Sequence, residues 1–68
     1  MATIIENHNK AAKHLEEAAK FHREAAKFYD EEDNDKAHQS TIKAIRHTMH
    51  AKDIEKLILK QMLLKSNL

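Results

Sequence analysis

A seven-residue repeat in the first half of the chain is the feature that most limits what this sequence can fold into. Three consecutive heptads, starting at Ala11, Ala18 and Ala25, share the pattern Ala-Ala-Lys-(His/Phe)-(Leu/His/Tyr)-(Glu/Arg/Asp)-Glu. The pair Ile4-Ile5 fills the Ala-Ala slot one heptad earlier. A period of seven is a helix period, and its persistence favours left-handed supercoiled packing between helices.

The absence of Gly and Pro from the 68 residues strengthens the expectation of helix and excludes several functional classes. Glycine-rich phosphate loops and dinucleotide-binding fingerprints need Gly at fixed positions. Tight two-residue hairpins favour it as well, so an all-β fold is not expected. With no Cys, neither a disulfide nor a thiolate metal site can stabilise the chain. The length fits one domain, residues 1–68, whose small core favours stabilisation by oligomerisation.

The first helix has a recognisable start and end. Thr3 followed by Glu6 matches a capping box, in which each residue satisfies a free backbone N–H of the other. The helix is therefore predicted to run from about residue 4 to residue 30. The acidic stretch that follows breaks the repeat, and Asp33 or Asn34 is predicted to cap a second helix.

The second helix is predicted over about 35–65, because nothing in that range demands a break. Two helices joined by a short turn form an antiparallel hairpin, in which position i faces about position 65 − i. The predicted fold class is therefore all-α, an antiparallel two-helix hairpin in which the second helix extends past the first.

The apolar surface of the first helix is wider than a hairpin needs. Its apolar positions span an arc of about 160°, whereas a two-stranded coiled coil needs only a narrow stripe. The hairpin is therefore predicted to dimerise into a four-helix bundle. The alanines of the first helix allow one neighbouring helix to approach closely. The second helix is predicted to pack against them with one broad face that includes Ala37, Thr41, Ala44, Ile45, Thr48, Met49 and Ala51.

The distribution of apolar residues around the second helix changes beyond Lys52–Glu55, where charged residues enter the predicted face. Its last part is apolar on all sides, which is typical of an interface, although a frayed apolar terminus is the alternative. The aromatic residues of the first helix occupy a wider edge that a neighbour must fill. The predicted oligomer interface consists of Phe21, Phe28, Ile54, Leu57, Ile58, Met62 and Leu64.

Charge divides the chain into two complementary halves. Residues 1–35 carry a net charge of −4 and residues 36–68 a net charge of +5, so the halves are expected to pair with each other. The net charge of the whole chain, +1, is not typical of a nucleic-acid-binding protein. Nor do aromatic residues alternate with the basic residues of the second half, so no nucleic-acid binding is expected. No membrane span or signal peptide is expected, which makes a cytoplasmic location the default.

The histidines are the one group of residues in the sequence whose chemistry suits the binding of a metal ion. The chain has six, and the facing rule places His14 near His47 and His50. Neutral imidazole binds Zn, Cu and Ni, so these three residues are a candidate metal site, with Glu17 as a candidate fourth ligand. Ordinary seam or surface histidines are the alternative. We expect no resident cofactor apart from such a metal.

The same heptads resemble a family of small bacterial helical-hairpin proteins rich in His and Ala. Residues 11–27 carry the family's Ala-Ala-Lys-His-His-Glu-Glu type of repeat, and residues 33–37 carry its acidic turn followed by Lys-Ala. Phe21 and Phe28 stand where the family often has His. The resemblance implies a helical hairpin and no established activity.

Together these features predict a non-enzymatic module that assembles with itself, with no nucleic-acid or membrane partner. The alternative function is a transition-metal-binding bundle. No catalytic residues are predicted, since no nucleophile and base can be specified from the sequence.

Overall fold

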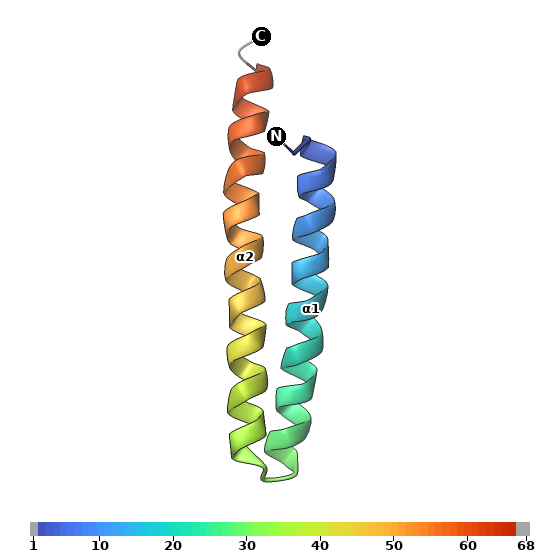
Figure 1. Cartoon of the computed structure of the whole chain (residues 1–68), viewed down its shortest axis with the longest axis vertical. Helices are drawn as coiled ribbons and strands as arrows, with labels where there is room; N and C mark the ends of the chain where they lie inside the picture. Colours follow the sequence, from blue (N-terminus) through green and yellow to red (C-terminus); the bar gives the residue numbers. More distant parts are fainter. Residues whose placement is uncertain (1, 67–68) are drawn as a thin grey trace.

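The computed structural model is an antiparallel pair of long α-helices joined by a tight turn (Figure 1). It describes residues 2–66, and side chains from residue 2 to residue 64. Helix α1 runs over Ile4–Asp30 and helix α2 over Asn34–Ser66, which confirms the predicted all-α hairpin and both helix boundaries to within about one residue. The rod measures 55 × 16 × 13 Å, and α2 extends past the start of α1.

Helix α1 begins with the predicted capping box. The Thr3 hydroxyl accepts a hydrogen bond from the Glu6 backbone N–H at 3.1 Å, and the Thr3 backbone N–H donates to the Glu6 carboxylate at 3.4 Å. Two of the N–H groups that a helix start leaves without intrahelical partners are satisfied in this way.

The turn at the end of α1 uses a left-handed residue without glycine. Glu32 has a φ of 60°, the conformation in which Gly is ordinarily favoured. Its N–H donates to the Tyr29 carbonyl at 3.1 Å, and the Asp33 N–H donates to the Phe28 carbonyl at 2.9 Å. These two bonds define a Schellman motif, which satisfies the last carbonyls of the helix while reversing the chain. Asp33 then caps α2, since its carboxylate accepts from the Lys36 N–H at 3.4 Å.

Replacing Glu32 with glycine is expected to raise the free energy of unfolding by about 1 kcal/mol, because glycine adopts the left-handed conformation without a Cβ clash. Urea denaturation followed by circular dichroism measures the change. The matched control is Glu31→Gly, at a position where φ is −83° and glycine should destabilise the helix end. A destabilised Glu32→Gly variant would contradict the strain assigned to this turn.

Alanines recurring every seven residues form the contact between the two helices. Ala37, Ala44 and Ala51 of α2 have no exposed surface, and Ala11, Ala18 and Ala25 of α1 are 5% exposed. Small side chains at these positions let the two backbones approach closely, as the heptads predicted. Ile58 continues the series in α2 and is 6% exposed.

A second heptad series completes this seam, and it mixes polar with aromatic side chains. On α1 it comprises Asn7, His14, Phe21 and Phe28, and on α2 it comprises Ser40, His47, Ile54 and Gln61. The Asn7 amide donates to the Gln61 side-chain oxygen at 3.0 Å, and the Gln61 amide donates to the Ala2 carbonyl at 3.0 Å. These pairs fix the register of the open end of the hairpin.

Two sequence-based expectations about α2 are wrong in detail. Ile45 and Met49 do not share the seam with the alanines, since they are 50% and 61% exposed. The charges at Lys52–Glu55 do not interrupt the seam either, because Lys52, Asp53 and Glu55 are exposed while Ala51, Ile54 and Ile58 carry the heptads onward. The physical reason is the close approach of the helices, which admits only a narrow stripe of each.

The negative charge of the first half gathers at the turn and not along α1. Helix α1 carries no net charge and α2 carries +4, and no ion pair joins the helices among the side chains of residues 2–64. The ion pair that does form links Lys36 to Asp33 beside the turn, at 3.7 Å. Such an exposed pair contributes little stability, about 0–1 kcal/mol.

Candidate functional site

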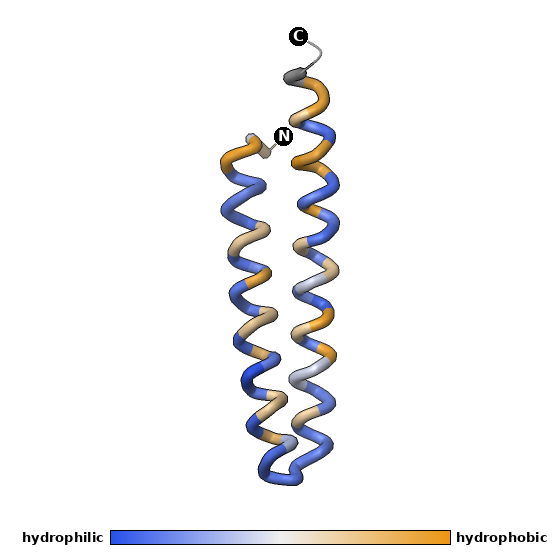
Figure 2. Tube along the Cα trace, turned by 180° about the vertical axis from the view of Figure 1, so that it is seen from behind, coloured by the Kyte–Doolittle hydropathy of each residue, from blue (hydrophilic) through white to orange (hydrophobic). Residues whose placement is uncertain are grey.

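Large apolar side chains lie mainly on the outside of this hairpin. No large side chain within the described residues is fully buried. Figure 2 shows hydrophobic positions gathering toward the open end, while the turn is hydrophilic. The large hydrophobic residues that are at least 45% exposed are Ile5, Leu15, Tyr29, Ile42, Ile45, Met49, Leu57, Leu59, Met62, Leu63 and Leu64.

Six of these residues lie along one side of the hairpin, which we call the apolar flank. It consists of Ile5, Leu15 and Tyr29 of α1 and Ile45, Leu59 and Met62 of α2. Heptad spacing places them beside the seam on the same side of each helix. Leu15 and Leu59 line one groove between the helices, together with His8 and Ala12. Tyr29 and His38 meet at a ring-centroid distance of 5.8 Å near the turn.

His8 and His22 also belong beside the flank rather than in the seam. They share a heptad slot with Leu15 and Tyr29, and two apolar residues in that slot favour a place at or near the seam. All four side chains are exposed in the hairpin. The seam is too narrow to cover this slot with a single partner helix.

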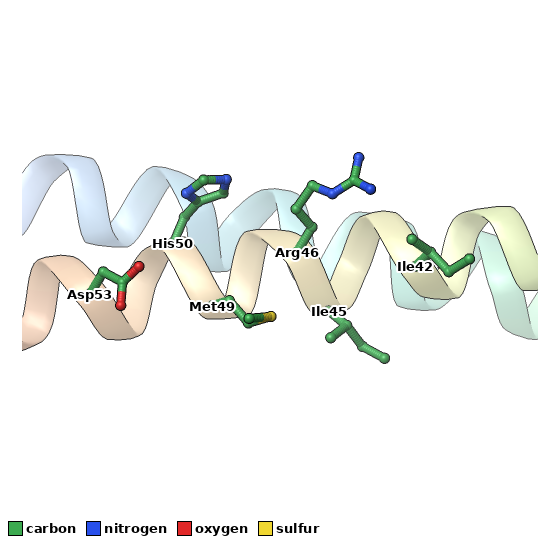
Figure 3. A pocket seen from close by; sticks show the side chains of 6 residues that line it. All are labelled: Ile42, Ile45, Arg46, Met49, His50 and Asp53. Carbon is green, nitrogen blue, oxygen red and sulfur yellow. The ribbon is translucent and has the colours of Figure 1, made fainter.

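Further apolar side chains extend from the flank onto the outer side of α2, where Ile45 and Met49 were predicted to lie in the seam. Ile42, Ile45 and Met49 line a shallow hollow together with Arg46, His50 and Asp53. Figure 3 shows Arg46 and His50 pointing to one side of α2 and Ile45 to the other. The signal for the correct orientation is present in the sequence, since the alanines at 37, 44 and 51 repeat the seven-residue spacing that marks the seam in α1.

The residues predicted for the oligomer interface divide into two groups. Phe21, Phe28, Ile54 and Ile58 contribute to the seam of the hairpin itself, and all are half-buried or buried. The Lys43 ammonium lies 5.5 Å from the centre of the Phe21 ring, and Lys36 lies 5.8 Å from the centre of the Phe28 ring. Leu57, Met62 and Leu64 are 50%, 51% and 65% exposed and lie outside the seam.

The three histidines proposed as metal ligands come together across the two helices. The Nδ1 atoms of His14 and His47 are 2.9 Å apart, a hydrogen bond in which one imidazole donates and the other accepts. His50 stacks on His14 with ring centroids 5.1 Å apart. The Phe21 ring stacks on His47, with ring centroids 5.7 Å apart and an interplanar angle of 8°.

The environment of His14 disfavours its charged form. Partial burial is the largest effect that lowers the pKa of His14, and the neighbouring His47, His50 and Lys13 lower it further. The Glu17 carboxylate acts in the opposite direction and raises the pKa of His14. His14 therefore favours the neutral state, which is the state that donates or accepts in the hydrogen bond with His47.

Among the described residues, no group of three or more His, Cys, Asp or Glu side chains is arranged to hold a metal ion. The imidazole cluster is thus a hydrogen-bonded pair with a third ring stacked beside it. Within the same part of the chain, neither helix is long and apolar enough to cross a membrane.

Comparison with known proteins adds no relative. No family model, no curated protein and no solved structure matches the chain. The resemblance to small bacterial His- and Ala-rich hairpins therefore stays a prediction.

Proposed function

We propose that this chain is a non-enzymatic assembly module that dimerises through its apolar flank into a four-helix bundle. The observation that supports the proposal is that small side chains lie inside the hairpin and large apolar ones outside, the reverse of the usual arrangement. Alanines occupy the seam of the hairpin, while leucines, isoleucines and methionines remain outside it. A second hairpin packed on the flank would bury them.

The surface area of the single hairpin supports the same conclusion. A compact monomer of its mass, 7.9 kDa, has about 4,400 Å² of accessible surface. This hairpin has 5516 Å². The excess of about 1,100 Å² is larger than the ~800 Å² that each partner contributes to a standard protein interface.

The shape of the flank fits another helical hairpin. On α1 the large residues alternate with Ala12, Ala19 and Ala26, which leave room for side chains of a partner helix. The groove lined by Leu15 and Leu59 runs between the helices, so a partner side chain can enter it without separating them. Such interlocking of large and small residues is how helices of a bundle pack.

Charge favours one orientation of a second copy. Helix α1 has no net charge and α2 carries +4, so α2 packed against α2 would bring like charges together, whereas α1 packed against the α2 of another chain avoids this repulsion. A two-fold axis parallel to the helices places each α1 on the partner's α2. Both turns then lie at the same end of the bundle, and like helices occupy its diagonals.

Analytical ultracentrifugation and native mass spectrometry test the proposal on protein purified without a metal-affinity step. We expect a dimer of about 16 kDa, twice the chain mass. A hairpin that stays monomeric and fully helical across the micromolar range would overturn the proposal. So would a monomer that associates only when another protein is added, since that result assigns the flank to a different partner.

The orientation has a separate test, because the chain has no cysteine and one introduced cysteine is unique. A spin label on Glu31→Cys beside the turn reports the distance between the two turns. Turns at the same end of a four-helix bundle give a distance below about 30 Å. A distance near the 55 Å length of the rod would show that the hairpins pack in the opposite orientation.

A further inference from the structure

The hydrogen-bonded histidine pair is the feature of the hairpin that packing explains least. His14 and His47 occupy matching slots of the seam, and both are half-buried. The next two heptads of α1 fill the same slot with Phe21 and Phe28, which pack without requiring a polar partner. In the histidine pair, by contrast, the Nδ1 atom of each ring faces the Nδ1 atom of the other at a distance of 2.9 Å.

We propose that His14 and His47 form a binding site for a divalent transition-metal ion of the zinc, copper and nickel class. The ion would be held by the two Nδ1 atoms, in place of the proton that they share. The imidazole that carried its proton on Nδ1 carries it on Nε2 after binding, so both rings stay neutral and no proton is lost. This site goes beyond the assembly function and does not depend on it.

The distance between the two nitrogens is close to what such an ion requires. Zinc binds imidazole nitrogen at about 2.0–2.1 Å with tetrahedral angles, which places two ligating nitrogens about 3.3 Å apart. The present 2.9 Å separation therefore has to widen by about 0.4 Å, accompanied by a tilt of the rings. Rotation of half-buried side chains on a seam of small residues supplies a movement of that size.

The surroundings of the pair suit an ion that keeps part of its water shell. Two nitrogens leave two tetrahedral positions, and His50 is exposed at 5.1 Å from His14, measured between ring centroids. The Glu17 carboxylate acts on His14 electrostatically and adds negative charge beside the site. Because no third ligand is already in place, we infer a site completed by water, with His50 as the nearest further imidazole.

Nitrogen NMR of the imidazoles provides the decisive experiment, since it distinguishes Nδ1 from Nε2. The uniformly ¹⁵N-labelled full chain is titrated with Zn²⁺, starting from protein treated with a chelator. We expect the Nδ1 resonances of His14 and His47 to shift together, and Nε2 to be protonated in both rings of the metal-bound protein. Coordination through Nε2, or a response confined to the exposed His8, His22 and His38, would overturn the proposal.

Matched variants add a measurement of affinity. Phenylalanine at position 14 or 47 copies the residue that the seam already holds at Phe21 and Phe28, and His22→Phe is the control at an exposed histidine. Loss of an outer-shell partner weakens metal binding about 10–100-fold, so loss of a direct ligand should weaken Zn²⁺ binding by about tenfold or more. Equal affinities for His14→Phe and His22→Phe would refute the site. The wild-type NMR result stands even if a variant folds poorly.

Discussion

Replacing Leu59 with glutamate is expected to dissociate the dimer while leaving the hairpin folded at high protein concentration. Leu59 is 58% exposed in the single hairpin, where the change should alter stability by no more than about 0.5 kcal/mol. In the proposed dimer Leu59 would be buried in the apolar flank, and each of the two leucines would contribute about 1.5–3 kcal/mol of burial. The dissociation constant should therefore rise at least about 100-fold.

Sedimentation equilibrium measures that constant, and the chain provides a matched control for it. Leu57 is 50% exposed and has the same chemistry, but its heptad position lies on the side of α2 opposite the flank. Leu57→Glu should leave the dimer intact. If Leu57→Glu dissociates the dimer and Leu59→Glu does not, the interface lies on that opposite side, where Leu64 is also exposed.

Replacing Ala44 with leucine is expected to abolish the hairpin at room temperature. Ala44 has no exposed surface, and the helices approach each other closely at this point. Three extra carbon atoms there force the helices apart, and overpacking of a filled core costs about 1–3 kcal/mol or more. A domain this small has only a few kcal/mol of stability to lose.

Thermal and urea unfolding followed by circular dichroism at 222 nm measure the loss. Gln39→Leu is the control, because it introduces the same side chain at an exposed position of the same helix. Leucine and alanine differ in helix propensity by only a few tenths of a kcal/mol, so propensity does not account for a large effect. An Ala44→Leu variant as stable as the parent would show that the alanine seam is not closely packed.

Local chemistry made much of the fold predictable. The capping box at Thr3 and Glu6, the helix boundaries and the cap at Asp33 depend on residues within one or two turns of each other. The register followed from the position of the turn, and it brought His14 to His47 and His50 as the facing rule expected.

Other features depended on how closely the helices approach. The sequence predicts a wide apolar arc on each helix. It does not show which part of that arc the other helix covers. Ile45 and Met49 were therefore assigned to the seam and are exposed. Likewise Glu32 adopts a left-handed conformation that no local preference of glutamate favours, because the antiparallel return of the chain requires it there.

The sequence by itself determined two long helices, one reversal and an excess of apolar surface, since these follow from periodicity, capping and composition. Only the tertiary structure decided that alanines would occupy the seam and larger residues the flank. The physical reason is that alanine at every seventh position allows a close approach of the backbones, which leaves no room for larger side chains between the helices.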